Sequence, residues 1–239
     1  QDEWKVKDKF DMNLGLRAYY FQQGSYFDLE PRISATYMTD AGIRLKGAFA
    51  VANQYIHLIV RNNISLPTDL WFPSTENLKP SRSYQGVLGA ETNIFDDTYL
   101  LSVETYYKKM NNLLEYRDDA EFTIGIPLEE QFTSGTGDAY GIEFFLNKKI
   151  GDFSGWVGYT LAWTKRQFAD LNNGKEFYPR YDRRHDVSVT INYELGDSWE
   201  LGASWVYGTG QAFTLPTSTY IWHDDSFYND DRYVFSERN

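Results

Sequence analysis

Residues 187–207 have the sequence VSVTINYELGDSWELGASWVY, and this stretch decides the fold class. Apolar residues occupy every second position of Val187–Leu195, and polar residues stand between them. The alternation resumes after the tight turn Gly196–Ser198 and continues through Trp199–Tyr207. A period of two residues indicates a strand with one apolar and one polar face. The stretch therefore predicts an antiparallel hairpin.

Seven further segments alternate in the same way, so the sequence predicts about nine strands. No segment has a comparable 3.6-residue period, and helix is expected to be absent or minor. Several segments span about ten residues or more, whereas strands of soluble proteins are most often about five to six residues long. The seven segments are Phe10–Tyr20, Phe27–Tyr37, Ile43–Val51, Tyr84–Ile94, Tyr99–Met110, Tyr140–Ile150 and Val157–Trp163.

The connections between these strands are short at one end and long at the other, as in a transmembrane β-barrel. The tight turns are Thr39–Gly42, Phe95–Thr98, Ile150–Phe153 and Leu195–Ser198. The intervals between hairpins are the irregular segments Val60–Pro80, Arg117–Gly137, Ala169–Arg184 and the tail after Thr209, with only Gln22–Ser25 short. Because short turns of such barrels face the periplasm, the turn residues Asp40, Asp96, Asp152 and Asp197 are expected there.

Aromatic residues begin and end the apolar face of individual strands. Trp199 and Tyr207 do so in one strand, and Tyr99 and Tyr107 in another. Eight residues at about 3.3 Å each, tilted by about 45°, cover roughly 19 Å of membrane normal, close to the apolar band of about 25 Å between aromatic girdles. A soluble barrel or sandwich would instead bury this face. Strand length and the one-sided distribution of loop lengths favour a membrane barrel whose apolar face contacts lipid.

Composition excludes several other classes of protein. The chain has 239 residues, a net charge of −11 and 18% aromatic residues, and an acidic surface does not suit nucleic acid. Its mean hydropathy is −0.54, and no apolar run approaches the roughly 18 residues of a transmembrane helix. It has no cysteine, which excludes disulfides and thiolate metal sites.

The expected sheet is incomplete. Bacterial barrels of one chain have even numbers of strands, so about nine strands do not close. An open edge in lipid would leave backbone groups unpaired at several kcal/mol each. Residues Gln1–Trp4 also lack the features of a signal peptide. We therefore expect residues 1–239 to be a segment of a larger barrel.

Three segments carry a family resemblance. They are Gly137–Glu143 (GDAYGIE), residues 155–162 (GWVGYTLA) and Tyr178–Asp186 (YPRYDRRHD), and Leu29–Arg32 and residues 66–83 add to the ordered series. This series resembles the barrel of TonB-dependent outer-membrane receptors, especially those of Bacteroidetes-type bacteria.

The resemblance implies a 22-stranded barrel in the outer membrane of a Gram-negative bacterium, with a plug domain inside it. The chain would then be a partial barrel domain, with the plug and the closing strands absent from residues 1–239. The resemblance further implies import of a scarce nutrient (siderophore, haem, vitamin, glycan or peptide) with energy from the TonB–ExbB–ExbD complex. Lipid, lipopolysaccharide and a surface lipoprotein are the other implied partners. A passive porin-like or secretion-associated barrel, or a soluble carbohydrate-binding all-β protein, is the alternative.

Exposed aromatic residues in the long loops are candidate ligand contacts. Trp71 and Phe72 lie between two prolines in a loop expected outside, and Tyr220 and Trp222 lie in the acidic tail. Such side chains stack on sugar rings, haem or aromatic siderophores. The competing interpretation is that the loops pack on their own apolar residues.

Arginines of the segment Tyr178–Asp186 are the second group of candidates. Arg180, Arg183 and Arg184 would grip an anionic ligand or lipopolysaccharide phosphate, because a guanidinium presents a planar fork to such groups. The competing interpretation is a loop-to-strand junction whose charges pair with one another.

No catalytic or metal site is predicted. The three histidines lack metal-ligand spacing, and the acidic pairs of the tail match no calcium loop. Nucleophile and phosphate-loop motifs are absent, so we expect no enzyme activity and no cofactor. These histidines are His57, His185 and His223, and the acidic pairs are Asp224, Asp225, Asp230 and Asp231. Polar residues expected to face the barrel lumen are Arg44, Lys46, Glu104, Lys108, Glu143, Glu194 and Glu200.

Overall fold

The computed structural model describes residues 2–7, 9–59, 70–117, 127–196, 198–212, 216–222 and 230–235. Within this part, only the backbone is described at residues 2–7, 70, 216–222 and 230–235. Asp197, the loop residues 60–69, His223 and the pair Asp224 and Asp225 lie outside the described residues.

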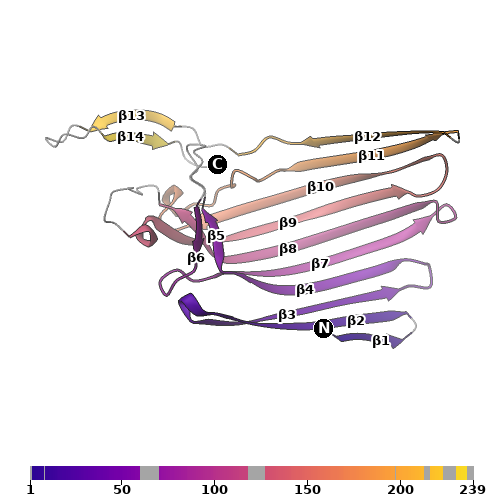
Figure 1. Ribbon diagram of the computed structural model, residues 1–239, viewed down its shortest axis with the longest axis horizontal. Coiled ribbons are helices and arrows are strands. Elements are labelled where there is room, and N and C mark those ends of the chain that lie inside the picture. The colour runs from indigo at the N-terminus through magenta and orange to yellow at the C-terminus, as the bar shows by residue number, and fades with distance from the viewer. Residues whose placement is uncertain are drawn as a thin grey trace.

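The described chain forms one large antiparallel sheet of ten strands (Figure 1). Their order in the sheet is β1-β2-β3-β4-β7-β8-β9-β10-β11-β12, a meander in which only β4 and β7 are separated by other strands. The strands are β1 (Asp2–Lys7), β2 (Phe10–Phe21), β3 (Tyr26–Met38), β4 (Arg44–Gln54), β7 (Ser81–Ile94), β8 (Tyr99–Tyr116), β9 (Phe132–Lys148), β10 (Phe153–Phe168), β11 (His185–Leu195) and β12 (Trp199–Gly208).

Two hairpins stand apart from this sheet. One pairs β5 (Ile56–Ile59) with β6 (Leu70–Pro73), and the other pairs β13 (Pro216–Trp222) with β14 (Asp230–Phe235). Short 3-10 helices occupy Gln22–Gly24, Leu128–Gln131 and Asn172–Gly174. None of the helices in the described part of the chain is long and apolar enough to span a membrane.

All nine predicted strands are present, as β2 to β4 and β7 to β12. Three features differ from the prediction: β1 adds a tenth strand, two hairpins lie where no strand was expected, and β8, β9 and β10 are longer than expected. The length of β8 was missed because a bulge interrupts its alternation. Asn112 has a left-handed φ of 54°, and the register with β9 shifts between Met110 and Leu113.

The tight turns gather at one end of the sheet, as predicted (Figure 1). They join β3 to β4, β7 to β8, β9 to β10 and β11 to β12. In the turn between β7 and β8, Phe95, Asp96 and Asp97 have φ values of 53°, 52° and 62°. We call this the turn end and the opposite one the loop end.

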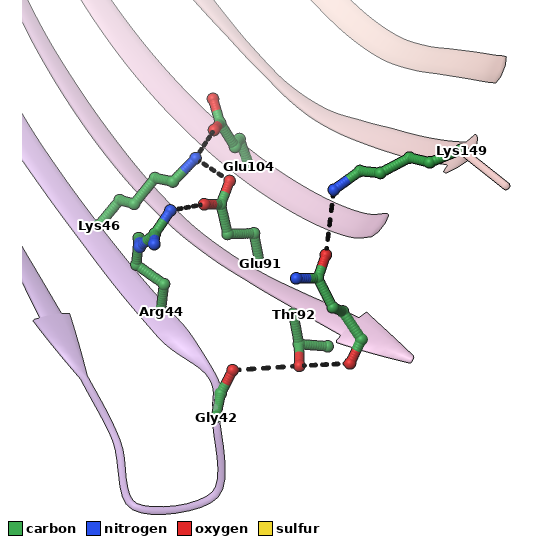
Figure 2. A network of polar contacts seen from close by, with 8 residues as sticks. Gly42, Arg44, Lys46, Glu91, Thr92, Glu104 and Lys149 are labelled. Atoms are coloured by element: carbon green, nitrogen blue, oxygen red, sulfur yellow. Dashed lines mark hydrogen bonds and ion pairs between the residues drawn. The ribbon is translucent and has the colours of Figure 1, made fainter. Parts of the chain in front are cut away.

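One face of the sheet is polar and carries charge networks. Glu91 of β7 accepts a hydrogen bond from Arg44 Nη1 at 2.5 Å and pairs with Lys46, whose Nζ lies 3.6 Å from Glu104 (Figure 2). The register places Lys108 on this face and pairs Glu104 with Glu143 and Glu194 with Glu200. All residues predicted to face the lumen thus lie on this inner face.

The other face is apolar and remains exposed among the described residues. A large uncovered apolar face marks a surface made for another apolar phase. In an antiparallel sheet of long strands with this loop asymmetry, it is the lipid-facing side of a transmembrane β-barrel wall. β1 and β12 form the sheet edges, so the barrel is not closed within the described part. Exposed residues of this outer face include Leu14, Leu16, Ile33, Phe49, Leu88, Leu101, Phe144, Leu146, Val157, Ile191, Leu201 and Trp205.

Candidate functional site

The β5–β6 hairpin covers the inner face at the loop end, where Figure 1 shows it crossing the strand direction. His57 of β5 makes the main polar contacts of this hairpin. His57 Nε2 lies 3.0 Å from the Oγ of the fully buried Ser74, and His57 Nδ1 lies 3.4 Å from Ser81 Oγ of β7. Because Ser81 donates its hydroxyl proton to Asn112 O at 2.6 Å, Nδ1 is the donor towards Ser81 and Nε2 accepts from Ser74. Burial lowers the pKa of His57 below its usual 6.5, so this imidazole is neutral at pH 7.

The connection between β10 and β11 folds back over the same face. Phe168, Leu171 and Phe177 form a buried apolar cluster against Leu113 of β8. Arg166 and Phe177 exchange two backbone hydrogen bonds of 2.9 Å each, which extend the pairing of β10 into the connection. The apolar cluster and these hydrogen bonds hold the connection beside the hairpin.

A pocket of about 310 Å³ lies between the hairpin and this connection. Its polar lining is His57, Ser81, Glu115, Arg166, Arg180 and Tyr181, together with Gln54. Residues that pair across neighbouring strands share a face of the sheet. Ser81 and Glu91 are an even number of residues apart in β7, so their side chains lie on the same face. Arg166 pairs with Gly137, and Gly137 pairs with Met110 of β8. Met110 is an even number of residues from Glu104 in β8, so Arg166 lies on the same face as Glu104. The pocket is therefore on the inner face.

Among the described residues, the pocket lining carries one positive charge in excess. Arg166 Nη1 donates to Glu115 Oε1 at 2.7 Å, and the two side chains are only 14% and 11% exposed. The Arg166 guanidinium also lies 4.9 Å from the ring centroid of Tyr181. Arg180 is exposed and has no carboxylate partner among the described residues. Two arginines and one carboxylate beside a neutral His57 leave a net charge of +1.

The arginines of the predicted cluster separate into two environments. Arg180 lines the pocket. The Arg184 guanidinium lies 4.7 Å from the ring centroid of Trp163 and 3.3 Å from Asp182, and Trp163 belongs to the outer face through its pairing with Tyr140. Arg183 is exposed and makes a distant ion pair with Asp186 at 3.8 Å. Arg183 and Arg184 thus have partners within their own motif.

The aromatic candidates also differ from one another. Trp71 is 63% exposed and stands opposite Leu58, a residue of the pocket lining, in the β5–β6 hairpin. Phe72 packs edge-to-face on Phe132, with ring centroids 5.2 Å apart. Tyr220 and Trp222 lie in β13, where only the backbone is described.

Of the residues that line the pocket, Arg180 alone was a sequence candidate, and His57, Glu115 and Arg166 are among those that the sequence did not indicate. Glu115 and Arg166 lie 51 residues apart in sequence, and the bulge in β8 hides the face of Glu115. No local pattern brings them together. Among the residues that the structure describes, no group of His, Asp and Glu is arranged to hold a metal ion.

The open antiparallel sheet, its apolar outer face and the covered inner face at the loop end define the wall of a membrane-spanning β-barrel. Residues 1–234 match the family model described as "TonB dependent receptor-like, beta-barrel", and the chain belongs to this family.

Solved structures with the same fold are transport receptors of low sequence identity. The chain is similar to FpvA of Pseudomonas aeruginosa bound to heterologous pyoverdines, with 12% identity and a TM-score of 0.59 over 98% of this chain and 30% of that one. It is similar to the FrpB iron transporter from Neisseria meningitidis, with 14% identity and a TM-score of 0.59 over 89% and 32%. It is also similar to the ferric-catecholate import receptor Fiu from E. coli, with 16% identity and a TM-score of 0.56 over 84% of this chain and 32% of that one. The chain spans about a third of these proteins. A comparison with curated protein sequences found no match.

Proposed function

We propose that the chain forms part of the barrel wall of an outer-membrane receptor of Bacteroidetes type, which imports a scarce nutrient with TonB-transduced energy. The match of residues 1–234 to the receptor barrel family carries this proposal. A plug domain and the closing strands would come from outside residues 1–239. Binding and transport require no covalent chemistry, so the protein is not an enzyme.

The two ends of the sheet support an orientation for this receptor. Tight turns gather at one end, and the β5–β6 hairpin and the described parts of the long connections gather at the other. In outer-membrane barrels the short turns face the periplasm and the long loops face outwards. The ligand then meets the loop end, where Arg180 lines the pocket and Trp71 is exposed beside it.

The outer face defines the lipid contacts. Tyr107, Tyr140 and Trp163 pair across three neighbouring strands, and Tyr140 stacks on Trp163 with ring centroids 5.4 Å apart. Aromatic belts of this kind sit at the headgroup level. Arg184 over Trp163 would lie beside lipopolysaccharide. The TonB–ExbB–ExbD complex would act through the plug, and a surface lipoprotein would cover the loop end.

Uptake by intact cells tests the proposal. We expect a deletion strain to lose uptake of one nutrient among labelled siderophores, haem, cobalamin, glycans and peptides, and to regain it on complementation. A strain without TonB should show the same loss. Uptake that depends on the receptor but not on TonB would instead indicate a passive channel.

A further inference from the structure

We infer that the inner-face pocket binds an anionic oxygen group of the ligand, a carboxylate or a phosphate, through Arg180 and Arg166. This inference rests on the proposed function, in which the ligand meets the loop end. It adds the chemical class of the group that this part of the barrel recognises.

The first argument is the charge of the pocket. The whole chain has a net charge of −11, whereas the pocket lining has one positive charge in excess. Arg180 supplies that excess, because it has no carboxylate partner in the described part of the chain. A guanidinium matches carboxylate and phosphate groups with two parallel hydrogen bonds. The sign of the local charge therefore selects an anion.

The second argument is the position of Arg166. Its side chain lines the pocket, and its Nη1 donates to Glu115. Its Nε is buried and has no hydrogen-bond partner among the described atoms, so an oxygen in the pocket does not reach this atom. Arg166 therefore attracts a bound anion through its positive charge.

The other polar groups of the lining are already used within the protein. Ser81 donates to Asn112 O, and both nitrogens of His57 contact serine hydroxyls. The Glu115 carboxylate also faces the pocket, and Arg166 at 2.7 Å offsets its charge. The charged donors that remain for a ligand are those of the exposed Arg180.

The size of the pocket limits what it can hold. A volume of about 310 Å³ is at the lower end of the range of about 300–1,000 Å³ found for small-molecule sites. We therefore expect it to take one anionic arm of a larger ligand, while the exposed Trp71 lies near the remainder.

Chemical protection of Arg180 tests this inference on the complete receptor purified in detergent. Phenylglyoxal modifies accessible arginines, and peptide mass spectrometry measures its rate at each position. Citrate and inorganic phosphate serve as separate probes, and glycerol serves as the neutral control. We expect citrate, phosphate or both to slow the modification of Arg180 by at least about threefold, with glycerol without effect. Arg183 is 47% exposed outside the pocket and should react at an unchanged rate. The protecting probe identifies the carboxylate or the phosphate source.

Substitution gives the second readout. Arg180→Gln should lower the affinity for the protecting probe by about tenfold or more, the usual effect of losing a charge-assisted hydrogen bond. Arg180→Lys should retain part of the affinity, and Arg183→Gln should match the wild type. Heat-modifiable migration on gels checks that each variant folds.

Two results would overturn the inference: equal modification of Arg180 with and without either anion, or unchanged probe affinity in Arg180→Gln. If complementation with the receptor still restores uptake to the deletion strain, such results remove the anion site and leave the transport function standing. Loss of the transport function would instead appear in the uptake experiment, whatever the probes show.

Discussion

A charged residue on the outer face of β8 should destabilise the barrel strongly. Val103 lies midway between Tyr99 and Tyr107 and pairs with Ala90 and Phe144 of the neighbouring strands. This position corresponds to the middle of the apolar band. Arginine on the lipid face costs about 2–4 kcal/mol at the bilayer midplane. Val103→Arg should therefore lower the folding equilibrium constant in lipid by about 30-fold to 700-fold.

The neighbouring residue offers a matched control. Ser102 faces the inner side and pairs with Glu91, so its side chain does not meet lipid. Ser102→Arg should change the free energy of unfolding by less than about 1 kcal/mol, as substitutions outside packed or desolvated positions usually do. Urea titration of the receptor in phospholipid vesicles, followed by tryptophan fluorescence, measures both variants. Equal costs for the two variants, or a larger cost for Ser102→Arg, would refute the assignment of faces.

Three further predictions concern single contacts. Glu115→Gln should lower the free energy of unfolding by about 3–5 kcal/mol, because it leaves the Arg166 guanidinium buried without its charged partner. The double variant Glu115→Gln with Arg166→Met should recover most of this loss. The same urea titration measures both variants. Gly155→Ala should lower the melting temperature, because φ is +145° and a Cβ would lie 2.2 Å from Thr190 O; an unchanged melting temperature would contradict this. The hairpin should become less stably docked as pH falls below 6.5, because burial lowers the pKa of His57 and the undocked state then binds more protons. Hydrogen exchange of β5 measures this, and the pH dependence should disappear in His57→Gln.

The strands and turns could be predicted because their signal is local. A side-chain period of two assigns each residue to a face without knowledge of its neighbours. Val187–Leu195 and Trp199–Tyr207 show this, since their predicted bounds agree with β11 and β12 within two residues. The assignment of residues to a face fails where this period of two is interrupted. The bulge at Asn112 shifts the face of every later residue in β8, and Glu115 was not assigned to the lumen for that reason.

The pocket could not be predicted because its parts meet only in the folded chain. Arg180 was a candidate on its residue type, but its separation from Arg184 depends on the path of the connection between β10 and β11. The contact of His57 with Ser74 and Ser81 depends on a hairpin that closes over the sheet. Short strands such as β5 and β6 carry too few residues for a periodic signal.

Cysteine accessibility tests the central claim, that the loop end faces outwards and the turn end faces the periplasm. Residues 1–239 contain no cysteine, so each single substitution adds the one thiol of this segment, and the unsubstituted receptor measures any other labelling. Glu76→Cys places a thiol at the exposed loop end after β6, and Asp40→Cys places one in the turn between β3 and β4, where the Asp40 side chain is 89% exposed. A membrane-impermeant maleimide should label Glu76→Cys on intact cells and Asp40→Cys only after the outer membrane is opened. Labelling of Asp40→Cys on intact cells, with Glu76→Cys protected, would contradict the account.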